Sequence, residues 1–307
     1  DDTITGAGGD DTIDGGEGDD VAIFPGNHSA YTFASSTDGL TVTVTDAVSG
    51  EADTLTGVET LRFADQDIGV SFDVESGQLV LTGSDSVDSL NIVGDVPITV
   101  LGVGGSDNLV GGEGADEIDG GAGDDIIAGG VGDDAIMGGA GDDDIDGGAD
   151  NDFIDGGVGD DTITGADGDD TIDGGEGADV AIYAGNQSDY TFASSTDGLT
   201  VTITETSTGY VDTVTGVETL SFADGDIGVS LDGNGLVLTG LDDVDSIEIV
   251  GDVAVTVLGQ DEADTLTGGF GNDIIDGGEG DDIVDGGAGD DTITGAGGDD
   301  TIDGGEG

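Results

Sequence analysis

Aspartate residues recur every nine positions along much of the chain, and carboxylates at so regular a spacing indicate the binding of hard cations. Nine consecutive units from Gly102 follow the pattern G-G-x-G-x-D-x-U-x, in which U is a large apolar residue. Carboxylate and carbonyl oxygens in flexible turns without His or Cys suit Ca²⁺ better than Zn²⁺ or a strictly octahedral Mg²⁺. The candidate metal ligands are the sixth-position residues Asp2, Asp11, Asp20, Asp107, Asp116, Asp125, Asp134, Asp143, Asp152, Asp161, Asp170, Asp179, Asp264, Asp273, Asp282, Asp291 and Asp300.

The same pattern predicts the elements that position these carboxylates. Glycine permits positive φ and a close approach of backbone carbonyls, so the first six positions form a turn and the last three a short strand. The apolar eighth position is occupied by Leu109, Ile118, Ile127, Ile136, Ile145, Ile154, Ile163 and Ile172. We expect these residues to stack as one interior ladder of an all-β solenoid.

Stacking also aligns the aspartates into columns of like charge. With rungs about 4.8 Å apart, neighbouring carboxylates repel by roughly 1 kcal/mol in water and about 4 kcal/mol at an effective dielectric constant of 20. A chain of this length has a net stability of only about 15 to 45 kcal/mol. Because repeated contacts of this kind could unfold the chain, we expect bound Ca²⁺ to be part of the fold.

Composition limits the partners that the chain can take. Its 307 residues include 72 Asp plus Glu, a single Lys or Arg, 65 Gly and no Cys, and the formal net charge is -71. Such acidity often indicates disorder, but 34% of the residues are apolar and they are placed periodically. The charge excludes nucleic acid and anionic membranes as partners. No run of about 18 apolar residues indicates membrane insertion.

The chain alternates repeat arrays with two copies of a spacer. Both spacers contain YTFASSTDGLTVT, at Tyr31 and at Tyr190, and residues 41–45 alternate as a half-buried strand should. The stretch from Ser89 keeps strand-and-turn spacing without the acidic turn, which predicts a calcium-free rung. The expected segments are the end of an array (1–21), spacer module 1 (22–101), a nine-repeat array (102–180), spacer module 2 (181–258) and a further array (259–307).

Longer repeats indicate a tandem architecture. Residues 290–307 have the same sequence as residues 1–18, and a variant copy begins at Asp160. We therefore expect the chain to be a window on a longer tandem protein.

The nonapeptide resembles the repeat of the RTX, or haemolysin-type, calcium-binding family. This resemblance implies a parallel β-roll with two nonapeptides per turn and Ca²⁺ between turns on the same side. It pairs every second aspartate, for example Asp107 with Asp125, which gives roughly eleven sites completed by turn carbonyls. The turns at Gly147 and Gly259 are the weakest, because non-glycine residues depart from the pattern at Asp150 and Glu262 in the fourth position and at Ala7, Val103, Ala166, Gln260 and Ala296 in the second.

Other polar residues have more ordinary interpretations. The fifth-position acids, such as Asp124 and Asp142, are either solvated or direct ligands. Turns at 65–67 and 224–226 could hold an isolated calcium loop but fit ordinary turns better. His28 corresponds to Gln187 in the second spacer, and Arg62 to Ser221, so neither is expected to have a ligand role or a catalytic role shared by both spacers.

The sequence favours a structural function over an enzymatic one. It contains neither H-E-x-x-H nor G-x-S-x-G, so we expect no enzyme activity. The leading hypothesis is the calcium-stiffened repeat region of a secreted bacterial fibre, adhesin or surface-layer protein, extracellular or on the cell surface, with further copies of itself as possible partners. The alternative is the RTX folding and export segment, of the type I secretion kind, of an enzyme or toxin whose active domain lies elsewhere.

Overall fold

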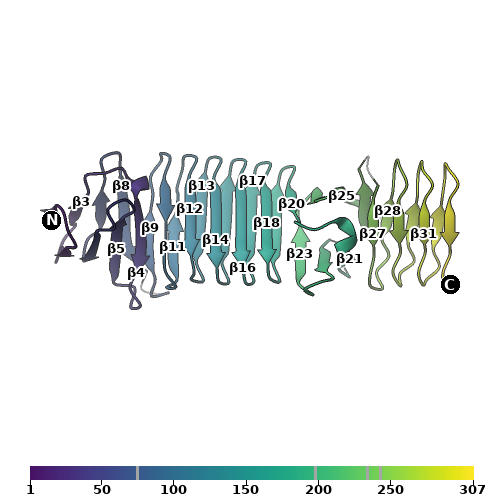
Figure 1. Ribbon diagram of the computed structural model, residues 1–307, viewed down its shortest axis with the longest axis horizontal. Coiled ribbons are helices and arrows are strands. Elements are labelled where there is room, and N and C mark those ends of the chain that lie inside the picture. Colours follow the sequence, from purple (N-terminus) through teal and green to yellow (C-terminus); the bar gives the residue numbers. More distant parts are fainter. Residues whose placement is uncertain (74–75, 197–198, 233–234, 242–243) are drawn as a thin grey trace. The chain divides into compact units, whose positions relative to one another are not determined.

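The computed structural model describes residues 1–73, 76–196, 199–232, 235–241 and 244–307. It consists of two compact units, residues 1–161 and 162–307. The described regular structure is all-β, drawn as arrows in Figure 1, apart from two single-turn 3-10 helices, η1 (His28–Ala30) and η2 (Gln187–Asp189). No helix among the described residues is long and apolar enough to cross a bilayer. The bounds of the five expected segments stay a prediction.

In the first unit, the nonapeptides build a parallel β-roll. Each repeat contributes one strand, and successive strands alternate between two sheets, so two nonapeptides complete one turn. One sheet contains β10 (Ser89–Asn91), β12 (Asn108–Gly112), β14 (Ile126–Val131) and β16 (Asp144–Ala149). The other contains β11 (Ile98–Leu101), β13 (Glu117–Ala122), β15 (Ala135–Ala140) and β17 (Phe153–Val158).

The apolar eighth positions form the core of this roll, but as two ladders. Leu109 pairs with Ile127 in one sheet, and Ile118 pairs with Ile136 in the other. The expectation of one ladder is wrong, because consecutive repeats lie in different sheets. All these side chains are buried, so the two ladders supply the apolar interior between the sheets.

The first spacer of this unit extends both sheets through antiparallel meanders. The strands are β1 (Thr3–Ile4), β2 (Thr12–Asp14), β3 (Val21–Ile23), β4 (Tyr31–Ser35), β5 (Thr41–Asp46), β6 (Ala52–Thr56), β7 (Thr60–Arg62), β8 (Asp67–Phe72) and β9 (Leu79–Thr82). β6 and β7 pair in parallel with repeat strands β2 and β3, whereas β4–β6 and β7–β9 are antiparallel. The sheet with β7 continues through β9 to β11. The expected strand at 41–45 is confirmed as part of β5, with Val42 and Val44 buried.

The second unit repeats this organisation with its own spacer. It begins with β18 (Thr162–Asp167), β19 (Thr171–Glu176) and β20 (Val180–Ile182). Antiparallel meanders follow, made of β21 (Tyr190–Ser194), β22 (Val201–Glu205), β23 (Val211–Thr215), β24 (Thr219–Phe222), β25 (Gly225–Asp232) and β26 (Gly235–Gly240). The roll resumes with β27 (Ser246–Glu248), β28 (Thr256–Leu258), β29 (Thr265–Thr267), β30 (Ile274–Asp276), β31 (Ile283–Asp285), β32 (Thr292–Thr294) and β33 (Thr301–Asp303).

The turns require left-handed backbone at defined positions. Among the described residues, the non-glycine residues with positive φ are Ala7, Val103, Asp150, Ala166, Gln260, Glu262 and Ala296. These are the same residues that depart from the glycine pattern in the sequence. The backbone of the turn is therefore kept even where a side chain makes that conformation unfavourable by about 1 to 2 kcal/mol per residue.

Candidate metal centres

The sixth-position aspartates lie at the turns, and the backbone of the preceding rung orients their side chains. The N–H of Asp107 donates to Oδ1 of Asp125 at 2.7 Å, and the N–H of Asp125 donates to Oδ1 of Asp143 at 2.8 Å. The same bond joins Asp116 to Asp134. Asp107, Asp116, Asp125, Asp134 and Asp143 are only 1 to 2% exposed. Each carboxylate is thus fixed inside the turn, away from bulk water.

The second carboxylate oxygen of these residues has no hydrogen-bond partner. Buried Oδ2 atoms without a partner belong to Asp11, Asp20, Asp107, Asp116, Asp125, Asp134, Asp143, Asp264, Asp282 and Asp291. Leaving a charged oxygen buried and unpaired is strongly unfavourable. A repeated orphan of this kind at one position of the repeat indicates that the turn is built around a cation.

A first-position glycine leaves the space in which such a cation fits. A Cβ placed on Gly111 would lie 2.7 Å from Asp116 Oδ2 and 2.5 Å from the carbonyl oxygen of Gly129. At Gly138 the corresponding distances are 2.5 Å to Asp143 Oδ2 and 2.6 Å to the carbonyl oxygen of Gly156. Carboxylate and carbonyl oxygens therefore converge on a space that only glycine leaves open.

This donor set fits Ca²⁺. The sites offer hard oxygens from flexible turns, which Ca²⁺ accepts in variable geometry. Among the described residues, no group of three or more acidic, histidine or cysteine side chains is placed to hold a metal ion. A cation in these turns would be held by carboxylate and turn carbonyl oxygens together, as the resemblance to RTX repeats implies.

Burial makes the charged form of these carboxylates unfavourable without a cation. It raises the pKa of Asp116 and of Asp143 to about 7, and neighbouring aspartates in the columns, Asp134 and Asp161, add to the effect. The pKa values of Asp107 and Asp134 rise to about 6, again chiefly through burial. Backbone N–H groups oppose these shifts without cancelling them.

The expected every-second-repeat juxtaposition is present inside each unit. Besides the pairs above, it joins Asp134 with Asp152, Asp143 with Asp161, Asp2 with Asp20, Asp264 with Asp282, Asp273 with Asp291, and Asp282 with Asp300. The expected pairings of Asp152 with Asp170 and of Asp161 with Asp179 join residues of different units and stay predictions. So do the assignment of all these residues as ligands and the number of sites.

Spacer acids that sequence analysis missed continue the columns where an array ends. Asp11 donates its N–H to Asp53 Oδ1, and Asp20 donates to Glu59 Oε2. In the second unit, Asp212 and Glu218 accept in the same way from Asp170 and Asp179. The signal was present in the spacers, because each of these acids stands two residues before a buried Leu or Val of a strand, as in D-x-U.

Asp88 and Asp245 were also missed, although each likewise stands two residues before a buried apolar residue, and they begin new columns. The N–H of Asp88 donates to Asp107 Oδ1, and the N–H of Asp245 donates to Asp264 Oδ1. Unlike Asp107 and Asp125, Asp88 uses its Oδ2 to accept from the N–H and hydroxyl of Ser84. An oxygen already paired in this way supports the predicted calcium-free rung at Ser89.

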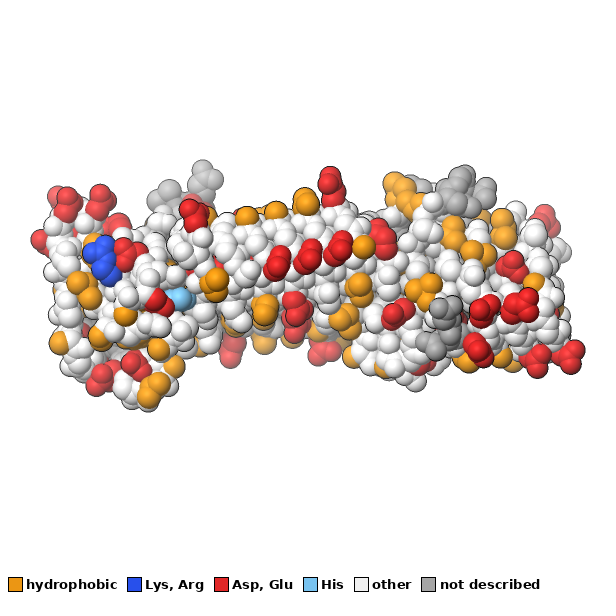
Figure 2. All heavy atoms as spheres, turned by 90° about the horizontal axis from the view of Figure 1, so that it is seen from above, with side chains coloured by type: hydrophobic (Ala, Val, Ile, Leu, Met, Phe, Trp, Pro, Cys, Tyr) orange, Lys and Arg blue, Asp and Glu red, His pale blue; other side chains and the backbone are white. Residues whose placement is uncertain are grey.

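The fifth-position acids lie on the surface. Asp124, Asp133, Asp142 and Asp160 are exposed, and red side chains follow one another in rows in Figure 2. Asp124 Oδ1 accepts from the N–H of Asp142 at 3.1 Å, which links the turns of neighbouring rungs. This placement favours the solvated interpretation over direct ligation.

The remaining candidate loops are ordinary turns held by their own acids. Asp67 forms an ion pair with Arg62 at 2.8 Å. Asp65 and Asp224 accept from the backbone N–H groups of His28 and Gln187. These bonds account for both turns without a cation.

Comparison with known proteins places these repeats in a family. The model of the RTX calcium-binding nonapeptide repeat matches residues 1–22, 101–136, 129–163, 147–181, 155–191, 258–293 and 276–307, which together cover a little over half of the chain. No curated protein sequence matches the chain. Among solved structures, the extracellular lipase LipA from Serratia marcescens matches over 52% of this chain and 28% of the lipase chain, with 22% identity and a TM-score of 0.29. On the family match, the chain belongs to the RTX calcium-binding nonapeptide repeat family.

Proposed function

We propose that this chain is the calcium-binding structural repeat region of a secreted bacterial fibre, adhesin or surface-layer protein. The observation that carries the proposal is the column of buried aspartates, in which Asp107, Asp125 and Asp143 have Oδ1 held by the preceding rung and Oδ2 unpaired. Such a column stabilises a solenoid only when cations balance it. Calcium is plentiful outside cells, so the roll would fold and stiffen after export.

In this proposal the backbone of the roll positions the oxygens that would hold the cation. The backbone N–H of one rung orients the carboxylate of the next, as Asp107 does for Asp125. The first-position glycine keeps the space beside Oδ2 open, and its counterpart in the next turn supplies a carbonyl oxygen. A bound Ca²⁺ supplies the positive charge that the column lacks. The Leu and Ile ladders then hold both sheets at a fixed spacing.

A stalk role is supported by how the roll extends. Parallel rungs add along one direction, and the first spacer carries one sheet on through β7, β8 and β9 to β11. Lengthening the chain therefore lengthens the solenoid without a new type of contact. The sequence has one Lys or Arg in total, so charge balance depends on metal ions. We propose no catalytic activity for this chain.

A second candidate is the folding and export segment of a secreted enzyme or toxin, exported by a type I route. Membership of the RTX family favours it, because calcium-coupled folding would serve that role equally well. The two candidates differ in what lies outside the chain. Many further copies of the repeat in the complete protein, and filaments in images of native material, would favour the fibre, whereas one catalytic domain would exclude it.

The calcium step is tested by circular dichroism of the chain in EGTA and after addition of Ca²⁺ or Mg²⁺. We expect a strong β signal with Ca²⁺ at millimolar concentration, and loss of most of it in EGTA at pH 8. A signal that is the same in EGTA would show that folding is independent of calcium. An equal response to Mg²⁺ at the same concentration would show a general charge effect instead of a calcium site.

A further inference from the structure

Each rung of the roll uses the backbone N–H and C=O of one residue in the rung before it. Asp107 donates its N–H to Asp125 Oδ1 at 2.7 Å and offers its carbonyl oxygen to the N–H of Ile126 at 2.8 Å. Asp264 and Asp282 are arranged in the same way. A rung that begins a column needs a substitute for this donor and this acceptor.

In the second unit, the side-chain amide of Gln187 provides both groups. Its Nε2 donates to Asp245 Oδ1 at 2.8 Å, and its Oε1 accepts from the N–H of Ser246 at 2.7 Å. The reverse orientation of the amide would set its NH₂ against the N–H of Ser246 and its oxygen against a carboxylate. Only one orientation of the amide therefore satisfies both partners. In this orientation the amide makes the same two contacts to the following rung that the backbone N–H and C=O of Asp107 make in the first unit.

Gln187 is held firmly in this position. Its side chain is fully buried, and its backbone N–H donates to Asp224 Oδ1 at 2.8 Å. It opens the single-turn helix η2 just before β21, whose Phe192 forms a parallel bridge with Ile249. The spacer therefore places the amide directly against the rung that restarts the column.

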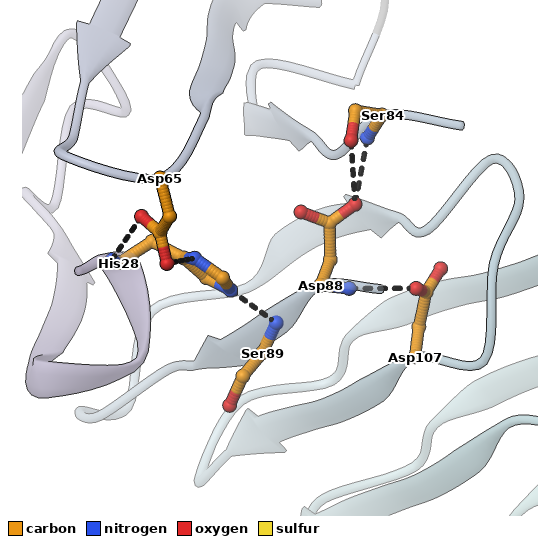
Figure 3. A network of polar contacts seen from close by, with 6 residues as sticks. All are labelled: His28, Asp65, Ser84, Asp88, Ser89 and Asp107. Atoms are coloured by element: carbon orange, nitrogen blue, oxygen red, sulfur yellow. Dashed lines mark hydrogen bonds and ion pairs between the residues drawn. The ribbon is translucent and has the colours of Figure 1, made fainter. Parts of the chain in front are cut away.

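In the first unit, His28 takes the equivalent position and provides only half of this cap (Figure 3). Its Nε2 accepts from the N–H of Ser89 at 2.8 Å, which requires that Nδ1 carries the proton and donates to Asp65 Oδ2 at 3.0 Å. The imidazole thus has no N–H left for Asp88. Accordingly, Asp88 Oδ1 is buried and has no hydrogen-bond partner.

We propose that residues 28 and 187 are positioning residues that cap the aspartate columns, each imitating the backbone N–H and C=O that a residue of a preceding rung would supply. Gln187 is a complete cap, and His28 satisfies the strand N–H but not the carboxylate. The spacer would then be a starting point for a new roll as well as a connection. This inference concerns how the calcium columns begin and does not depend on whether the whole protein is a fibre or an export segment.

The test compares reciprocal variants of the full chain in saturating Ca²⁺. Gln187→Met keeps the size of the side chain but removes both hydrogen bonds. We expect hydrogen exchange at the Ser246 amide to rise at least about tenfold, while the Asp264 amide, which bonds Asp282, keeps its protection. Unchanged protection at Ser246 would overturn the proposal.

His28→Gln is expected to stabilise the first roll, because the glutamine amide gives Asp88 Oδ1 a hydrogen-bond donor. The thermal midpoint of the first roll should rise by roughly 2 °C, and Gln187→His should lower that of the second roll by a similar amount. His28→Met is the matched control and should lower the midpoint of the first roll. A His28→Gln variant no more stable than the starting chain would contradict a cap, even if Gln187→Met failed to fold. If the starting chain bound no calcium but the variants still showed these changes in thermal midpoint, the proposed function would be overturned and the cap would stand.

Discussion

The carboxylate of Asp125 is oriented by the backbone N–H of Asp107, a residue one full turn earlier, at 2.7 Å. This bond uses one oxygen and leaves the other pointing into the space beside Gly120. It therefore separates two roles within one side chain, since Oδ1 sets the register of the rungs and Oδ2 is available to a cation. The separation makes the consequences of substitution predictable.

Replacing Asp125 with Asn should keep the register but weaken calcium binding. The amide oxygen can still accept from Asp107, whereas the negative charge is lost. We expect the bound calcium per chain to fall by about one to two ions, and the apo chain to need less added salt to fold, because repulsion in the column is smaller. Isothermal titration and circular dichroism measure the two effects.

Asp124→Asn is the matched control, because it removes the same charge one residue away on the exposed surface. Its calcium stoichiometry should stay that of the starting chain. Equal losses in both variants would show that total charge, and not the sixth position, governs binding.

Acid should stabilise the calcium-free roll. Burial raises the pKa of Asp116 and Asp143 to about 7 in the folded chain, whereas unfolded aspartate has a pKa of about 3.9. The folded state thus binds more protons between these two pKa values. The stability that the two groups contribute is therefore fully present below about pH 4 and is lost as pH rises through about 7. In EGTA, the β signal should be larger at pH 5 than at pH 8.

With Ca²⁺ present the dependence should reverse. Ligation requires the carboxylates to be ionised, so the calcium concentration needed for folding should rise as pH falls from 8 to 5. A calcium midpoint independent of pH in this range would contradict the assignment of these aspartates as ligands.

Much of this architecture follows from local pattern, while the capping contacts do not. The nine-residue register sets strand, turn and buried position for residues such as Ile127 and Asp125, because each repeat meets the same neighbours. The prediction of a single ladder was wrong because a nine-residue period alone does not give the number of repeats in each turn of the solenoid. The bonds from Asp20 to Glu59 and from Ser246 to Gln187 join residues about 40 and 60 positions apart, and they depend on how the spacers fold back.

Val103→Gly should stabilise the turn in which it lies. Val103 has a φ of 81°, and a β-branched residue is strongly disfavoured in this conformation. Removing the side chain should raise the free energy of unfolding by about 1 kcal/mol, after allowance for the greater freedom of glycine in the unfolded chain. Urea unfolding in saturating Ca²⁺ measures the difference. Val110→Gly, at the ninth position of the same repeat and within β12, should instead destabilise the chain.

Truncating the interior ladder should be far more damaging than truncating its surface neighbour. Ile127 is 1% exposed and Ile126 is 53% exposed, although the two are adjacent in β14. Ile127→Ala removes a buried side chain between the sheets and should lower the free energy of unfolding by about 2 to 5 kcal/mol. Ile126→Ala should change it by no more than about 0.5 kcal/mol. Because Ile127 lies two residues after Asp125, the core variant should also raise the calcium concentration needed for folding, whereas the surface variant should not. Equal effects at the two positions would mean that the ladder is not the interior of the roll.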